Sequence, residues 1–168
     1  MNRLIDKHRI KIAVTEILKS LGEDTDREGL KDTPKRVAQM YSDMFSGIGI
    51  DPANSLATVF EETYQDTVIF REITFFSMCE HHLLPFFGHA HIGYVPNTHI
   101  AGASKLARVL EVVSRRPQLQ ERMTIQIADA ILKAINPKGT AVVLEAQHLC
   151  MVMRGVQKVG SSIVTSAT

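Results

Sequence analysis

The chain has 168 residues, 45% of them hydrophobic and 22% charged, which excludes disordered and collagen-like classes. Nineteen Lys and Arg against eighteen Asp and Glu give a net charge of +1, without the basic excess of a nucleic-acid or membrane-surface binder. No apolar run reaches the roughly 18 residues of a membrane span, and the N-terminus lacks the apolar segment of a signal peptide. We therefore expect a cytoplasmic protein that binds neither nucleic acid nor membrane.

Residues 1–55 are predicted to form a helical arm. Apolar residues recur at helical spacing from Ile10 to Leu21, where a glycine follows as a stop signal. Thr33-Pro34 is typical of an N-cap followed by proline at the first helical position, and apolar residues continue on one face as far as Met44. Two helices are therefore expected before the next domain.

The hydrophobic period changes to two at residues 67–79, a β-branched and aromatic run that predicts a strand. Strict alternation through this run places Phe70 and Ile73 on opposite faces. Pro85 marks a turn, and residues 88–95 are predicted as the returning strand. We expect an antiparallel hairpin whose loop carries a cysteine and two histidines.

Two further helices and two further strands complete the predicted domain, residues 56–168. One helix begins after a Ser104 cap and ends before Pro117, and a longer one covers residues 119–134. Short strands are predicted over 140–146 and 161–166. The order of these elements indicates an α+β domain behind a helical arm.

Each of the two cysteines has a histidine close by. Cys79-x-x-His82 is half of a metal site, because two intervening residues let both side chains converge on one ion. Cys150 follows His148 at the end of a predicted strand. Three ligands with an open fourth position suit a catalytic zinc, whereas a structural zinc would need His81 or His148 as well. Spacing alone leaves open two buried apolar thiols, or a disulfide, which a cytosolic protein disfavours.

Several charged residues are suited to phosphate or base recognition. Ser104-Lys105 opens a predicted helix with Arg108 one turn further on, and a helix N-terminus beside two cations attracts phosphate. A solvated helix face explains the same residues more commonly. Arg154 adds a third cation four residues after Cys150. Glu121 lies in the first turn of a predicted helix, where an acidic residue is ordinary.

Four segments of the chain resemble the GTP cyclohydrolase I family. Its zinc-binding hairpin is similar to CEHHLLPFFGHAHIGYVPN, and its two central helices are similar to SKLARVLEVVSRRPQLQERMTIQIADAI. Its final signature is similar to HLCMVMRGVQKVGSSIVTSA, and its N-terminal helix pair to DREGLKDTPKRVAQMY. The segments occur in the family's order and cover nearly the whole chain.

The resemblance implies conversion of GTP and water into formate and 7,8-dihydroneopterin triphosphate, the entry to folate and other pterins. Zinc is the implied cofactor, with Cys79, His82 and Cys150 as its ligands. His148 is the implied proton donor and acceptor at the imidazole ring of the purine, and His81 assists ring opening and release of the formyl group.

The resemblance also implies how GTP is bound. Glu121 pairs with the N1 and amino edge of guanine, which discriminates against adenine, and Gln120 beside it is assigned to substrate binding as well. The residues implied around the sugar and triphosphate are Ser104, which is also counted as catalytic, Lys105, Arg108, Arg154 and, from the helical arm, Arg36.

The implied architecture is the tunnelling fold, an antiparallel sheet with two helices on one face that joins other sheets into a ring. The family forms homodecamers of two face-to-face pentamers, with sites at subunit boundaries. One rival is another tunnelling-fold enzyme acting on a purine or pterin. One such enzyme reduces a nitrile through a cysteine nucleophile without zinc and another uses a three-histidine zinc site, and a two-cysteine, one-histidine set fits neither. The other rival is a non-catalytic zinc-stabilised assembly module, which would need neither Glu121 nor the uncommitted His81 and His148.

Overall fold

The structure is a computed structural model that describes residues 5–56 and 59–168. Its elements in chain order are α1 (Lys7–Ser20), α2 (Thr33–Met44), the 3-10 helix η1 (Pro52–Leu56), β1 (Val59–Glu61), β2 (Val68–Cys79), β3 (Pro85–Val95), β4 (His99–Ala101), α3 (Ala103–Ser114), β5 (Pro117–Gln118), α4 (Gln120–Ile135), β6 (Gly139–His148), α5 (Leu149–Val152) and β7 (Ile163–Ala167). The predicted α+β class is confirmed. None of the helices in these ranges is long and apolar enough to cross a bilayer.

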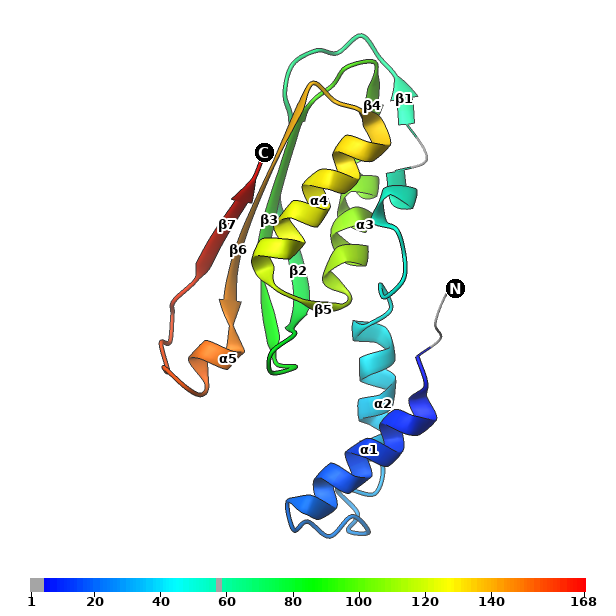
Figure 1. Cartoon of the computed structure of the whole chain (residues 1–168), viewed down its shortest axis with the longest axis vertical. Coiled ribbons are helices and arrows are strands. Elements are labelled where there is room, and N and C mark those ends of the chain that lie inside the picture. The colour runs from blue at the N-terminus through cyan, green and yellow to red at the C-terminus, as the bar shows by residue number, and fades with distance from the viewer. Residues whose placement is uncertain (1–4, 57–58) are drawn as a thin grey trace.

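Five strands form one sheet in the order β5-β2-β3-β6-β7. The pairs β2–β3, β3–β6 and β6–β7 are antiparallel, and β5 adds in parallel to the last two residues of β2. The helices α3 and α4 lie side by side on one face of this sheet (Figure 1). The strands β1 and β4 form a separate antiparallel pair near the N-terminal end of α3.

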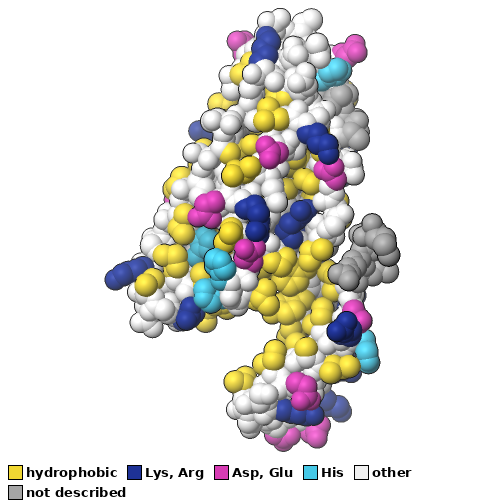
Figure 2. All heavy atoms as spheres, viewed as in Figure 1, with side chains coloured by type: hydrophobic (Ala, Val, Ile, Leu, Met, Phe, Trp, Pro, Cys, Tyr) yellow, Lys and Arg dark blue, Asp and Glu magenta, His cyan; other side chains and the backbone are white. Residues whose placement is uncertain are grey.

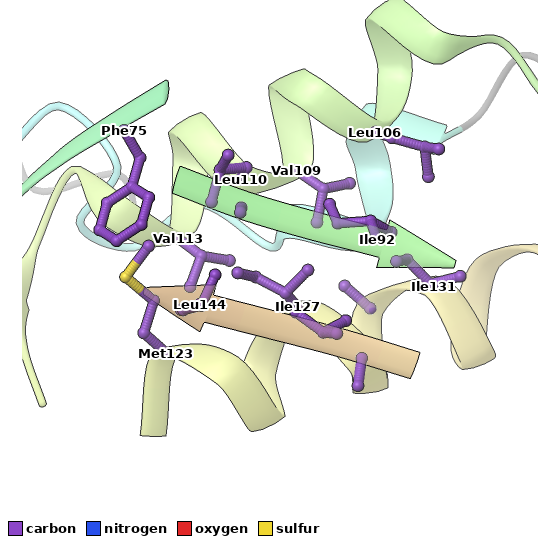
Figure 3. Close-up of a cluster of buried hydrophobic side chains, with 14 of the residues drawn as sticks. Phe75, Ile92, Leu106, Val109, Leu110, Val113, Met123, Ile127, Ile131 and Leu144 are labelled. Atoms are coloured by element: carbon purple, nitrogen blue, oxygen red, sulfur yellow. The ribbon is translucent and has the colours of Figure 1, made fainter. Parts of the chain in front are cut away.

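The hydrophobic core lies between the sheet and these two helices (Figure 3). Phe75, Ile92 and Leu144 point from the sheet toward α3 and α4, and all three are buried. The helices contribute Leu106, Val109, Leu110 and Val113 from α3, and Met123, Ile127 and Ile131 from α4. Their helical spacing gives each helix one apolar face, so burial against the sheet fixes how both helices lie.

The predicted alternation in β2 is wrong beyond Phe70. The pairing of β2 with β3 shifts between Phe70 and Ile73, and Glu72 has a φ of 57°. A bulge adds one residue to the strand and reverses the phase of its faces. Phe70 and Ile73 therefore both pack against the core, although strict alternation placed them on opposite sides.

The two N-terminal helices pack on each other, and Val14 of α1 and Ala38 of α2 are buried. The pair lies beside one end of the sheet domain (Figure 1). The 3-10 helix η1 spans the boundary that the sequence predicted between residues 55 and 56, and Leu56 already belongs to the main core. Asp32 occupies the N-cap position of α2, so Thr33 is its first residue and not its cap.

Four local expectations differ from the structure. Gly102 is the N-cap of α3, which places Ser104 within the first turn, because an extended glycine precedes the helix. The turn expected at Pro85 lies earlier, since Pro85 already pairs with Met78. Cys150 belongs to the short helix α5 and not to a strand end, while β6 continues as far as His148. His99 starts the short strand β4, in a stretch between the predicted strand 88–95 and the predicted helix for which no strand was predicted.

Candidate metal centre and acid–base site

The thiols of Cys79 and Cys150 and the imidazole of His82 converge. One ligand atom from each residue lies within 4.8 Å of the other two. Cys79 comes from the end of β2, His82 from the loop before β3, and Cys150 from α5 after β6. Because β2, β3 and β6 are neighbours in the sheet, residues 71 positions apart in the chain meet at one end of it. Figure 2 shows histidine side chains gathered at this end of the molecule.

A tight loop holds the first two of these groups in place. The amide of Cys79 donates to the carbonyl of Leu84 (2.9 Å), and the amide of Leu83 donates to the carbonyl of Cys79 (2.8 Å). Leu83 adopts a left-handed φ of 50°, which costs conformational energy in a residue with a branched side chain. The loop therefore reverses the chain within five residues and turns His82 back toward Cys79, whose Sγ lies 3.9 Å from Nδ1 of His82.

The donor set fits a zinc ion. Both cysteines are free thiols, Cys79 buried and Cys150 half-buried, which argues against a disulfide. Burial, followed by the neighbouring Cys79, raises the pKa of Cys150 above its ordinary value of 9.0. Two thiols that oppose each other's ionisation are stabilised as thiolates by a divalent cation between them. Two sulfurs and one imidazole nitrogen are donors that zinc prefers, and they leave a fourth position open.

His148 lies at the end of β6 and forms two close contacts. Its ring stacks on Phe86 of β3, with centroids 4.5 Å apart and planes 3° apart. Its Nε2 lies 2.8 Å from Oε1 of Gln120. Burial lowers the pKa of His148 below 6.5, and the charge of Glu121 partly opposes that shift. The ring is therefore neutral at pH 7 and able to accept a proton.

The structure places three more predicted residues near this group. Arg154, which is exposed, has its Nη1 3.1 Å from Nε2 of His82, so a cation stands beside the three candidate ligands. His81 is exposed, and its ring meets that of His82 edge-on at 6.2 Å. Glu121 is exposed in the first turn of α4, close enough for its charge to act on His148.

The remaining predicted residues lie elsewhere in the same chain. Ser104, Lys105 and Arg108 belong to the N-terminal half of α3. The C-terminal end of α3 contacts β2, where the hydroxyl of Ser77 donates to the carbonyl of Ser114 (2.7 Å). Ser77 is two residues before Cys79, so this end of α3 is the one near the candidate ligands. Ten residues separate Ser104 from Ser114, which is about 15 Å of helix. The first turn of α3 is therefore remote from the candidate ligands.

Arg36 is also remote, on the exposed side of α2. It lines a cavity of about 620 Å³ between α1 and α2, together with Lys7, Lys11 and Lys35. Its guanidinium lies 3.9 Å from the carboxylate of Asp32. Within one chain, Arg36 therefore shares a cationic surface with α1 and not with His82.

An ion pair that was not predicted from the sequence holds the loop between Cys79 and His82 against α4. Arg122 of α4 forms a salt bridge with Glu80, which stands between Cys79 and His81. The hydrogen bond from Arg122 lowers the pKa of Glu80 below 4.5. The amide of Glu80 also donates to the carbonyl of Gln118 (3.0 Å). The two partners are 42 residues apart, so no local pattern pairs them, although an acidic residue inside a ligand motif is a signal.

An α+β domain with a three-donor candidate metal site and an adjacent neutral histidine has the arrangement of a metal-dependent hydrolase. A family model described as GTP cyclohydrolase I matches residues 10–168 of the chain. The chain belongs to the GTP cyclohydrolase I family.

Individual relatives agree with this assignment. GTP cyclohydrolase 1 of Carboxydothermus hydrogenoformans is 56% identical over 165 residues, which are 98% of this chain and 86% of that protein. GTP cyclohydrolase 1 of Streptococcus pyogenes serotype M18 is 54% identical over 163 residues, 96% of this chain and 84% of that protein.

Among solved structures, the archaeosine synthase QueF-Like in the apo form aligns at 14% identity with a TM-score of 0.46, over 64% of this chain and 94% of that one.

Proposed function

We propose that this chain opens the imidazole ring of GTP by zinc-dependent hydrolysis, with release of formate. The rest of the GTP molecule then rearranges to 7,8-dihydroneopterin triphosphate. The overall reaction is the first step of folate and pterin biosynthesis. One observation carries the proposal: in a chain of the GTP cyclohydrolase I family, Cys79, His82 and Cys150 converge within 4.8 Å at the sheet end that carries His148.

Zinc would be held by Cys79, His82 and Cys150, and when bound it supplies Lewis-acid activation of water. The protein's own side chains move the protons. His148 is neutral at pH 7, because burial lowers its pKa, and it takes up and returns a proton at the imidazole ring of guanine. His81, exposed beside His82, assists ring opening and release of the formyl group.

Glu121 and Arg154 bind the substrate at the same end of the sheet. The Glu121 carboxylate accepts hydrogen bonds from N1–H and the amino group of guanine, a donor pair that adenine lacks. Arg154 stands beside His82, where its guanidinium is available to a phosphate oxygen. The base and the phosphates are thereby held while protons move at the ring between them.

A neighbouring chain supplies the other phosphate contacts. Along α3, Ser104 and Lys105 lie about 14–15 Å, and Arg108 about 9 Å, from Ser114, which contacts β2 two residues before Cys79. They reach a bound triphosphate if a second chain brings its own α3 to this site, and Arg36 of the helical arm reaches it in the same way. Ser104 then stands at the sugar, where a hydroxyl can take part in proton transfer.

The assembly proposed is a homodecamer of two pentamers in which tunnelling-fold sheets join into a ring. Two features of the single chain support it. The edge of β2 is paired by β5 only at Met78 and Cys79 among the described residues, and open edges favour strand pairing with a neighbour. Large apolar side chains are also exposed on the strands, namely Ile69, Phe76 and Val164, with 59–63% of their surface accessible.

We also place the protein in the cytoplasm, because its two cysteines are free thiols, as expected in a reducing compartment. The test of function is to incubate the zinc-loaded protein with GTP and to quantify formate together with the fluorescence of the oxidised neopterin product. His148→Ala should abolish product, whereas His89→Ala, which alters an exposed histidine on β3, should retain it. The absence of formate and neopterin from the zinc-loaded protein would overturn the proposal.

A further inference from the structure

The carboxamide of Gln120 is almost completely buried, with 2% of its surface exposed. Its Nε2 donates to the carbonyls of Ile163 (2.9 Å) and Leu144 (3.1 Å) and lies 3.2 Å from Oγ1 of Thr165. A flipped amide would place its oxygen against two carbonyl oxygens, which have no proton to donate. The orientation of this amide is therefore fixed, and Oε1 is the atom that faces Nε2 of His148.

This orientation determines which nitrogen of His148 carries the proton. An amide oxygen only accepts hydrogen bonds, so at 2.8 Å the Nε2 of a neutral His148 ring must be the donor. The lone pair of the neutral ring is then on Nδ1. The stack of His148 on Phe86, which is fully buried, holds the plane of the ring, and the 2.8 Å contact with Oε1 of Gln120 keeps Nε2 at this position in the plane.

The position of Gln120 is itself determined by three elements. It is the first residue of α4, and its side chain reaches the backbone of β6 at Leu144 and of β7 at Ile163. Thr124 Oγ1 donates to the carbonyl of Gln120 (2.7 Å) and lies 2.7 Å from Oγ1 of Thr165. A side chain anchored to a helix and two strands can orient its neighbour with little freedom of its own.

We propose that Gln120 is a positioning residue that holds His148 in the tautomer protonated at Nε2, so that Nδ1 is the nitrogen that exchanges protons with the substrate. This inference rests on the proposed function, in which His148 performs the proton transfer. It replaces the substrate contact predicted for Gln120 from the sequence, because both polar atoms of the buried carboxamide are already engaged within the protein. The role is analogous to that of a carboxylate behind a catalytic histidine, with a neutral amide as the acceptor.

The first test is a direct measurement of the tautomer. Zinc-loaded protein with ¹⁵N-labelled histidine is studied by solid-state NMR, which has no size limit, and His148 is assigned by difference from His148→Gln. A proton on Nε2 and an unprotonated Nδ1 are expected. A proton on Nδ1 would overturn the proposal, and this outcome is independent of whether the protein turns over GTP.

The second test compares variants of Gln120 with a matched control. Gln120→Met keeps the size but removes the acceptor, so His148 should show both tautomers, and kcat should fall by about tenfold or more while the KM for GTP changes by less than about threefold. Gln120→Glu keeps an acceptor for His148; its second oxygen replaces the Nε2 donor, so the acid must hold a proton to bond a carbonyl of Leu144 or Ile163, and in that form it should recover the Nε2–H tautomer. Thr165→Val is the matched control, because it removes a neighbour of the Gln120 amide but leaves the acceptor for His148 in place. It should leave the tautomer of His148 unchanged and kcat within about threefold of that of the unmodified protein.

The outcomes separate the two proposals. A raised KM with an unchanged kcat in Gln120→Met would return Gln120 to substrate binding and overturn the inference. If the unmodified protein forms no product, the proposed function fails, while the NMR measurement still decides the tautomer. If Gln120→Met does not fold, the spectrum of the unmodified protein and the comparison of Gln120→Glu with Thr165→Val decide the question.

Discussion

Because the residues proposed to bind phosphate are remote from the candidate metal ligands within one chain, two inactive variants should restore each other's activity. Each proposed site has a metal half, formed by the three candidate ligands and His148, and an α3 half, formed by Ser104, Lys105 and Arg108. His148→Ala damages only the metal half, and Lys105→Glu damages only the α3 half. If one site takes its metal half from one chain and its α3 half from the neighbour, a 1:1 mixture gives each half an even chance of being intact. About a quarter of the sites are then complete, so mixing should recover about 25% of the original activity.

The assay is GTP turnover after the two variants are unfolded and refolded together, with each variant refolded alone as the control. The prediction depends on the length of α3, which separates Ser104 from Ser114 by about 15 Å, whereas Ser114 is hydrogen-bonded to Ser77 of β2, two residues before Cys79. A site built within one chain would give no recovery, since every chain would carry one damaged half. A mixture no more active than the two variants alone would therefore refute the shared site.

Four further predictions follow from single positions. His148→Ala should retain zinc while kcat falls by about a hundredfold or more. Glu121→Gln should weaken GTP binding by roughly 2–3 kcal/mol, and should move the acid limb of the kcat profile to lower pH, because the Glu121 charge raises the otherwise lowered pKa of His148. Zinc affinity, followed by competition with a chelator, should rise with pH through the neutral and alkaline range, since the raised pKa of Cys150 keeps its thiol protonated until the metal displaces the proton. Gly88→Ala should lower the free energy of unfolding in urea by about 3 kcal/mol, because its Cβ would overlap the carbonyl oxygen of Glu145.

Each of these four predictions has a result that would contradict it. Loss of zinc from His148→Ala would make this histidine a ligand. Unchanged GTP affinity in Glu121→Gln would move base recognition elsewhere. A zinc affinity independent of pH would exclude thiolate ligands, and an unaltered urea midpoint for Gly88→Ala would show that the β3–β6 pair tolerates the methyl group.

Periodicity and local signals were sufficient for most of the secondary structure. Apolar spacing located α1, α3 and α4, and the run at residues 67–79 located β2. The bulge between Phe70 and Ile73 was missed, because either phase of the strand buries some of its many apolar side chains. The short pairs β1–β4 and β2–β5 were also missed, since two or three residues carry no period and are fixed by tertiary contacts.

The candidate site was predicted only in part, for a physical reason. The spacing of Cys79 and His82 is a local signal, and Cys150 was the only other thiol, so these three donors could be proposed and do converge. The role of Gln120 depends on carbonyls from β6 and β7, which no sequence spacing reveals. The residues proposed to bind phosphate were grouped by their charge, by the start of a helix and by the family resemblance, and none of these says which chain supplies Lys105.

The most direct test of the central claim is a zinc titration of the metal-free protein with GTP turnover as the readout. Three donors at one site per chain predict that formate production rises linearly with added zinc and reaches its plateau at about one zinc per chain. Cys150→Ser, titrated in parallel, should remain inactive at every zinc concentration that saturates the unmodified protein. Full turnover by the metal-free protein, or by Cys150→Ser, would contradict the account.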